Sequence, residues 1–262
     1  MSAKSSLAEK TIVVTRPLTQ AQNILELLEL RQATAIHFPV ISISVSKNVD
    51  IAKQYFKKLT EYQVIIFISA NSVHYAMSTA QELGIGFNNS MLAAVGPATK
   101  TALEKYGCTV AIVPETGFTS EDLLNDPALH DIAQQKILII RGDGGREHLR
   151  QSLEERGALV DYAEMYRRQL PSERNSINLT QLPKHDTAIL LYSAESAQNL
   201  WSLCTLEEQQ WLSNIAFIVG SKRIAEATTR VGFANNSIIA ENPSDEAMLT
   251  ALSTWAQMLP HS

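Results

Sequence analysis

The sequence predicts an α/β fold made of two similar domains, each with a mainly parallel sheet. Three observations support this. Short β-rich runs alternate with longer stretches whose apolar residues recur at helical spacing, which is typical of βα units. The 262 residues suffice for two domains with a core each. Landmarks of the first half also recur in the second half at a nearly constant spacing.

The expected strands are six short apolar runs. In chain order they are TIVVT (11–15), VIIFI (64–68), MLAAV (91–95), KILII (136–140), AILLY (188–192) and IAFIV (215–219). Each is rich in strand-forming residues and has the length of a buried strand. A stretch with helical periodicity follows each run, so a helix is expected after every strand.

The predicted helices begin and end at recognisable residues. Ser69 and Ser193 follow the second and fifth runs, and serine is an ordinary N-cap residue. After the third and the last run a glycine opens the helix, and a second glycine, Gly107 or Gly232, closes it. The same strand–serine–helix corner is therefore made twice.

These matched corners belong to a predicted internal duplication. The paired landmarks, each 124 or 125 residues apart, are Arg16 and Arg141, Ser69 and Ser193, Gly96 and Gly220, LLELRQA (27–33) and SLEERGA (152–158), and TSEDLL (119–124) and SDEAML (244–249). One domain per repeat would span roughly 11–133 and 136–258. In each half, however, a second extended run (35–45 and 159–171) is long enough to enter a neighbouring sheet, which would make the domains discontinuous. The residues alone leave both organisations open.

Composition excludes several classes of protein. With 45% apolar and 19% charged residues, the chain is typical of globular proteins, and its net charge of −5 argues against a general nucleic-acid binder. The longest apolar runs are strand-sized, and the N-terminus lacks the apolar segment of a signal sequence. Cys108 and Cys204 fit no disulfide or metal spacing. A reducing cytoplasm is the expected location.

No metal or cofactor motif stands out. The six histidines are scattered, and neither a Cys-x-x-Cys pair nor a phosphate-binding P-loop occurs. The two serine corners lack the glycines of a hydrolase nucleophile elbow. The run RGDGGRE (141–147) places Glu147 where a dinucleotide fingerprint needs its third glycine. The sequence therefore predicts no cofactor and no metal.

What remains is a set of strand-to-helix corners with hydroxyls, glycines and backbone donors. They are residues 15–17, 69–72, 96–99, 141–146 and 193–196. Ligands of parallel sheets bind beyond the carboxyl ends of the strands, and helix N-termini favour anions. Such corners would suit a polyanionic ligand. The plain alternative is that the hydroxyl residues only cap helices and that Gly144 and Gly145 only form a tight turn.

In their order along the chain, these motifs resemble the uroporphyrinogen-III synthase family. The matching segments are VVTRP (13–17), FISANSV (67–73), AVGPATKTALEKYG (94–107), SEDLL (120–124), ILIIRGDGGREHLRQSLEERGA (137–158), EMYRR (164–168), YSAES (192–196) and ENPSDEAML (241–249). The resemblance covers about 11–257. Its most specific part is the glycine-rich turn followed by Tyr166-Arg167-Arg168.

The resemblance implies two α/β domains joined by a two-stranded β linker, with the active site in a cleft between them. It favours the discontinuous organisation: residues 1–39 with 171–262 form one domain and 41–167 the other, with crossings near 39–42 and 167–172. The implied activity is that of a cofactor-independent lyase, which closes the linear tetrapyrrole hydroxymethylbilane with inversion of its last ring. Positioning and electrostatics would then drive catalysis.

The resemblance also assigns residues. Tyr166 matches the tyrosine proposed to assist departure of the hydroxyl group, as a general acid. The residues expected to bind substrate are Arg16, Ser69, Ala70, Asn71, Gly96, Thr99, Arg141, Gly142, Gly144, Gly145, Arg146, Ser193, Ala194, Ser196, Ser221 and Lys222. The second glycine loop lacks a threonine that is common in the family, and Ser221, Lys222 or Arg223 is expected to take its role. Ile68 and Tyr192 also stand where the family often has threonine.

The remaining expectations concern partners. The chain is expected to be a monomer that binds neither nucleic acid nor membranes. Hand-off of an unstable bilane fits a transient contact with hydroxymethylbilane synthase. The rival hypothesis is a binding or regulatory protein that has kept the cleft and lost turnover, which the departures at Ile68 and at residues 221–223 would favour.

Overall fold

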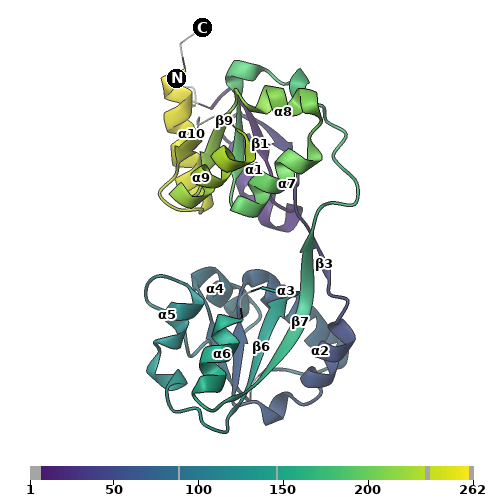
Figure 1. The fold of residues 1–262 in the computed structure, drawn as a ribbon, viewed down its shortest axis with the longest axis vertical. Helices are drawn as coiled ribbons and strands as arrows, with labels where there is room; N and C mark the ends of the chain where they lie inside the picture. The colour runs from purple at the N-terminus through teal and green to yellow at the C-terminus, as the bar shows by residue number, and fades with distance from the viewer. Residues whose placement is uncertain (1–6, 88, 146, 234–236, 260–262) are drawn as a thin grey trace. The chain divides into compact units, whose positions relative to one another are not determined.

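The computed structural model describes residues 7–87, 89–145, 147–233 and 237–259 (Figure 1). The chain forms two compact units. One combines the residues up to Ser42 with those from Gln169 onward, and the other spans Ile43–Arg168. The boundaries fall at the start of strand β3 (Ser42–Val45) and at the end of strand β7 (Leu159–Gln169).

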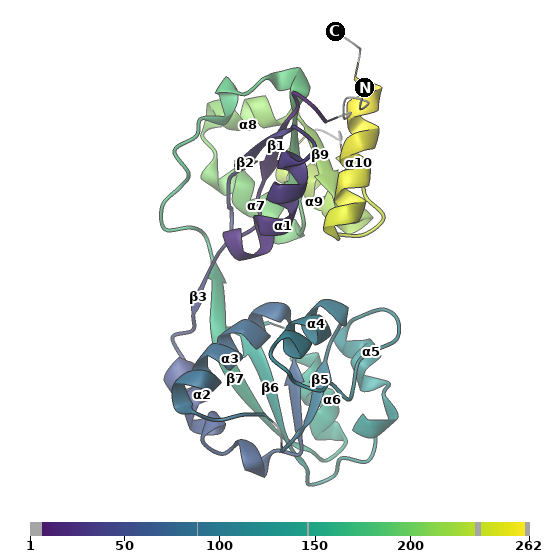
Figure 2. The same ribbon diagram turned by 180° about the vertical axis from the view of Figure 1, so that it is seen from behind.

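The discontinuous unit contains a five-stranded sheet of order β10-β9-β8-β1-β2, in which all neighbouring strands are parallel. Its elements are β1 (Thr11–Val14), α1 (Leu18–Glu29), β2 (Thr34–His37), β8 (Thr187–Leu191), α7 (Ala194–Leu203), α8 (Leu206–Leu212), β9 (Ala216–Val219), α9 (Lys222–Val231), β10 (Ser237–Ile239) and α10 (Asp245–Met258), with short 3-10 helices at Leu179–Gln181 and Lys184–Asp186. Helices α1 and α10 pack on one face (Figure 2), and α7 and α9 lie on the other (Figure 1).

The continuous unit contains the second sheet, of order β3-β7-β6-β4-β5, whose β7, β6, β4 and β5 are parallel. Its further elements are α2 (Val49–Phe56), β4 (Val64–Phe67), α3 (Ala70–Leu83), β5 (Met91–Ala94), α4 (Pro97–Lys105), α5 (Ser120–Leu124), β6 (Lys136–Gly142) and α6 (His148–Glu155), with 3-10 helices at Leu59–Glu61 and Pro127–Leu129. This sheet is covered on both faces. Alternate residues of β4 and β6 pack against α2–α4 on one side and α5–α6 on the other.

Burial on both faces explains why the sequence shows continuous apolar runs here. Ile65 and Phe67 of β4 join the core under α3, whereas Val64 and Ile66 join the core under α6. All four are essentially inaccessible to solvent. Strands of this kind need apolar residues at every position, as parallel strands between two helix layers do. The predicted fold class, an α/β fold with two parallel-dominated sheets, is confirmed.

Strand pairing follows the same register in both sheets. Thr11 pairs with Thr34 in one sheet. Lys136 and Leu159, which lie 125 residues after Thr11 and Thr34 respectively, pair with each other in the other sheet. An internal duplication would produce this correspondence; the duplication itself stays a prediction. Among the helices of the described residues, none has the length and apolarity that a bilayer span requires.

Candidate functional site

The predicted corner residues lie where strands end. In the continuous unit, Ser69 follows β4, Gly96 follows β5, and Arg141 lies at the end of β6. Because β4, β5 and β6 are parallel neighbours, their carboxyl ends share one edge of the sheet. Tyr166, near the end of β7, lies opposite Gly142 of β6 at the same edge. Parallel sheets bind ligands at this edge.

Tyr166 and Ser69 meet at this edge. The Tyr166 hydroxyl and the Ser69 Oγ form a hydrogen bond of 3.0 Å, although the residues are 97 positions apart. The Tyr166 ring stacks on Tyr75, with centroids 5.8 Å apart, and Tyr166 is only 5% exposed. A buried tyrosine whose hydroxyl is held by one partner has a fixed orientation. The predicted catalytic residue is therefore placed beside a predicted binding residue.

Ser69 has a second role as the N-cap of α3. Its Oγ accepts a hydrogen bond from the Ser72 N–H at 3.1 Å, and the Ser72 Oγ accepts one from the Ser69 N–H. This reciprocal capping box fixes the start of the helix. Ser69 therefore caps α3, as the plain interpretation of this corner predicts. This cap does not exclude the contact with Tyr166, because one hydroxyl can accept and donate at once.

Gly142 lets the two strands come close at this point. A Cβ on Gly142 would lie 2.8 Å from Cε2 and 2.9 Å from Cζ of Tyr166. The Asp143 N–H also donates to the Tyr166 carbonyl at 2.7 Å. The register between β6 and β7 shifts between Arg141 and Gly142. Absence of a side chain at Gly142 is therefore what allows the Tyr166 ring to lie here.

Arg141 is almost fully buried, with 3% of its surface exposed. Its Nη1 forms an ion pair with Glu147 Oε1 at 3.1 Å, and its Nε donates to the Gly142 carbonyl at 3.2 Å. The guanidinium also lies over the Tyr162 ring, 4.2 Å from the centroid. A Cβ on Gly145 would come within 2.7 Å of Nη2. The glycine turn thus makes room for a buried cation.

Tyr162 and Glu147 are site residues that the sequence analysis missed. The Tyr162 hydroxyl donates to Glu147 Oε2 at 3.0 Å. Burial, with a further contribution from that hydrogen bond, raises the pKa of Tyr162 to about 12, so the hydroxyl remains a donor at neutral pH. Glu147 attracted notice only as a departure from a dinucleotide motif. Tyr162 lies four residues before Tyr166, but the register shift at Arg141/Gly142 places the two rings in the cores on opposite faces of the sheet, so strand periodicity could not link them.

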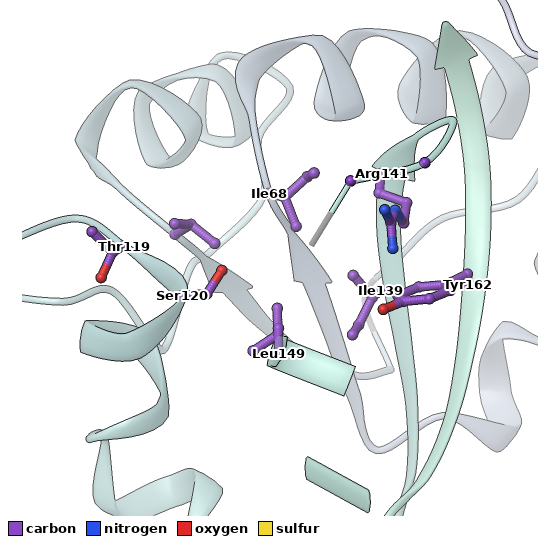
Figure 3. Close-up of a pocket in the computed structure, with 10 residues that line it drawn as sticks. Ile68, Thr119, Ser120, Ile139, Arg141, Leu149 and Tyr162 are labelled. Carbon is purple, nitrogen blue, oxygen red and sulfur yellow. The ribbon is translucent and has the colours of Figure 1, made fainter. Parts of the chain in front are cut away.

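A cavity of about 310 Å³ opens beside Arg141. It is lined by Ile68, Val95, Thr119, Ser120, Ile139, Arg141, Gly144, Gly145, Leu149 and Tyr162. Figure 3 shows Arg141 and Tyr162 on one wall and the hydroxyls of Thr119 and Ser120 on the other, with Ile68 between them. An apolar pocket with a few convergent polar groups is the usual form of a small-molecule site.

The other predicted residues of this unit lie near the same edge with different exposure. Ala70 is exposed and Asn71 half-buried in the first turn of α3. Gly96 is the N-cap of α4, and a Cβ there would meet Phe118 at 3.2 Å. Thr99 is buried in the first turn of α4. The predicted residue Arg146 lies outside the described residues.

In the discontinuous unit, Arg16 follows β1 and already has several partners. Its Nη1 pairs with Asp245 Oδ1 at 3.0 Å, and its Nη2 donates to the Pro243 carbonyl at 3.3 Å. Its guanidinium lies 3.5 Å from the centroid of the Tyr192 ring. The Tyr192 hydroxyl is buried, and burial raises the pKa of this group. Arg16 and Arg141 therefore share one arrangement: each stacks on a tyrosine and pairs with a carboxylate.

The remaining predicted residues of this unit follow β8 and β9. Ser193 caps α7, accepting from the Ser196 N–H at 3.0 Å, and Ala194 begins that helix. Ser221 precedes α9 without a side-chain cap, and Lys222 is exposed at the first position of α9. In the part of the chain that the structure describes, no group of three or more His, Cys, Asp or Glu side chains could hold a metal ion.

Comparisons with known proteins agree with one another. The family model described as uroporphyrinogen-III synthase HemD matches residues 22–250. A uroporphyrinogen-III synthase of Escherichia coli (strain K12) is 28% identical over 245 residues, which cover 92% of this chain and 99% of the relative. One from Proteus mirabilis is 31% identical over 159 residues, covering 60% of this chain and 80% of the relative.

Two solved structures are similar in fold. A mutant uroporphyrinogen III synthase from the extremely thermophilic bacterium Thermus thermophilus gives a TM-score of 0.62 at 18% identity, covering 94% of this chain and 99% of that one. The uroporphyrinogen-III synthetase of Helicobacter pylori 26695 gives the same values.

Proposed function

The chain belongs to the uroporphyrinogen-III synthase family, and on that premise we propose that it closes hydroxymethylbilane to uroporphyrinogen III with inversion of the terminal pyrrole ring. The family match spans most of the chain, which is what supports this proposal above the rival of a binding protein without turnover. The Tyr166–Ser69 hydrogen bond at the carboxyl edge is the structural observation that favours retained chemistry.

In the proposed reaction, the terminal hydroxyl of the bilane leaves with a proton as water, and an azafulvene remains. The substituted carbon of the last ring attacks this electrophile and forms a spiro intermediate. Breaking of the bond between that carbon and its original bridge, followed by reclosure at the free position, gives the inverted ring. Water is the other product, so the step requires no oxidant or reductant.

Tyr166 is the proposed proton donor to the departing hydroxyl. Its phenol is oriented by the Ser69 Oγ at 3.0 Å and by stacking on Tyr75. A positioned acid of this kind contributes about 10²- to 10⁴-fold in general. Ser69 then stabilises the orientation of the phenol and, as a cap, ties it to the start of α3.

The acetate and propionate arms of the substrate are proposed to bind at the carboxyl-edge corners of both units. Backbone N–H groups at the starts of α3, α4, α7 and α9 favour carboxylates. The buried guanidinium of Arg141, which pairs with Glu147 at 3.1 Å, is a cation at this edge of the continuous unit. We propose the full set of predicted binding residues, Arg16 to Lys222, for these contacts.

The function is tested by a coupled assay. Porphobilinogen and a bilane-forming enzyme are incubated with and without this protein, and the products are oxidised and separated as uroporphyrin isomers. Formation of the type III isomer at the expense of type I is the expected result. Type I alone, obtained with folded protein that still binds uroporphyrin, would instead support the binding protein.

A further inference from the structure

The buried guanidinium of Arg141 requires an anionic partner. Its side chain is 4% exposed, and an unpaired charge at that depth is strongly unfavourable. Within the described residues, Glu147 is the carboxylate that forms its ion pair, at 3.1 Å. The other contacts of Arg141 with described residues are neutral groups, the Gly142 carbonyl and the face of the Tyr162 ring.

Glu147 differs from Arg141 in burial. Its side chain is 51% exposed, and it precedes the first residue of α6. Its two carboxylate oxygens are held by Arg141 and by the Tyr162 hydroxyl. A half-exposed carboxylate can turn into solvent at small cost, whereas the buried guanidinium cannot follow it.

The two donors that hold Glu147 also line the cavity. Arg141 and Tyr162 form one wall of the 310 Å³ space (Figure 3). Its other walls are largely apolar, with Ile139 and Leu149 among them, and Ser120 adds a hydroxyl. A carboxylate on a short carbon chain would satisfy both kinds of wall, because its head pairs with the cation and its methylenes contact the apolar residues.

From this geometry we propose that the cavity beside Arg141 is a subsite for a carboxylate arm of the tetrapyrrole, and that Glu147 is an internal carboxylate which the arm displaces. The inference rests on the proposed function for the identity of the ligand. Glu147 neutralises Arg141 while the site is empty. When an acid arm enters, it takes over Arg141 and the Tyr162 hydroxyl, and Glu147 turns outward.

Such an exchange lowers the cost of having a buried cation ready for substrate. The guanidinium is never left unpaired, and the number of charged hydrogen bonds is the same before and after binding. The consequence is competition: Glu147 weakens binding of the arm. Removal of its charge should therefore tighten binding, which is the opposite of what loss of a substrate contact or of a structural support would do.

The test is a fluorescence titration with uroporphyrin III, a stable octacarboxylate, on the full chain. Glu147→Gln and Glu147→Ala remove the competing charge and should bind about three- to tenfold more tightly than the unaltered protein. Glu155→Gln is the matched control, because it removes the same charge from the exposed far end of α6. Its affinity should be unchanged. Thermal unfolding of each variant checks that it is folded.

Each other outcome contradicts the proposal. Equal or weaker binding by both Glu147 variants would mean that Glu147 supports Arg141 and does not compete, and absence of binding by all proteins would exclude the subsite. The isomer assay is scored separately. Tighter binding with only type I product would keep the subsite and overturn the function. Type III product without tighter binding would keep the function and overturn the subsite.

Discussion

At the residue scale, Tyr166 shows how a side chain of ordinary chemistry is prepared for one task. It is 5% exposed, stacks on Tyr75, and shares a hydrogen bond with Ser69. Both contacts come from residues that are distant in sequence, so the phenol has one orientation toward the sheet edge. Its hydroxyl is the one feature that phenylalanine would lack.

Tyr166→Phe should therefore lower kcat for type III formation about ten- to hundredfold, an effect at or below the low end of the usual range for a general acid. Stability should fall by about 1 kcal/mol or less, since one hydrogen bond is lost. Initial rates from the isomer assay measure the effect. Tyr75→Phe is the control: it keeps the stacked ring and loses only the bond to the Ile43 carbonyl, so it should stay near full activity. An unaltered rate in Tyr166→Phe would remove the hydroxyl from the mechanism.

Gly142→Ala tests the close approach of β6 to the Tyr166 ring. The new methyl would lie within 2.9 Å of two ring carbons and 3.1 Å from the Tyr166 carbonyl oxygen, so the ring must move at a cost of about 1–3 kcal/mol. We expect kcat to fall more than this loss of stability explains. Gly84→Ala is a contrasting control. It strains a left-handed position at the end of α3 but meets no atom within 4 Å, so stability should drop while activity stays. Full activity in Gly142→Ala would contradict the steric argument.

At the element scale, one carboxylate fixes the long segment between β7 and β8. Glu208 of α8 is 2% exposed. It pairs with Arg174, accepts from the Leu179 N–H at 3.2 Å, and accepts from the Thr205 N–H at 2.9 Å. Burial raises the pKa of Glu208, but these hydrogen bonds and the charge of Arg174 outweigh it, so the pKa lies below its ordinary value of 4.5.

Glu208→Gln should lower the free energy of unfolding by about 2–4 kcal/mol at pH 7. Because the folded-state pKa is depressed, the stabilisation is present above pH 4.5 and is lost as pH falls below it through the lower folded value. Urea unfolding should thus show that the difference in free energy of unfolding between the unaltered protein and Glu208→Gln shrinks below about pH 4.5. Glu207→Gln, at the exposed neighbouring position, should change stability by at most about 0.5 kcal/mol at any pH. A stability difference that grows in acid would contradict the lowered pKa of Glu208.

At the scale of the whole molecule, the sheets separate the chain into one continuous and one interrupted unit. All strands of the second sheet come from residues 42–169, whereas the first sheet joins β1 and β2 to β8, β9 and β10. The N-terminal and C-terminal parts of this unit are joined directly by the pairing of β1 with β8, in which Thr11 lies opposite Thr187. A fragment that contains only one sequence repeat would cut both sheets.

A fragment of residues 41–170 should therefore fold alone, with helical circular dichroism and a cooperative thermal transition, because it keeps both covered faces of its sheet. The fragment 136–258, a complete predicted repeat, should not, since β6 would lose β4 and β8 would lose β1. Cooperative folding of 136–258 together with an unfolded 41–170 would favour one domain per repeat.

Much of this protein could be predicted from its sequence. The six predicted strands, the helix starts at Ser69 and Ser193, and the α/β class follow from local periodicity and capping, which act over a few residues. The order of the motifs was enough to predict the family, which the comparisons confirm. Whether the predicted residues bind substrate stays a prediction.

The tertiary structure alone decided which of these residues meet. The Tyr166–Ser69 bond joins positions 97 apart, and the pairing of Arg16 with Asp245 joins positions 229 apart. The partners of Arg141 were likewise not predicted, because Glu147 stood out only as a departure from a dinucleotide motif and nothing in the sequence distinguished Tyr162 within its extended run. Such contacts depend on the order and register of parallel strands, and these are set by packing across the whole sheet, beyond the reach of local patterns.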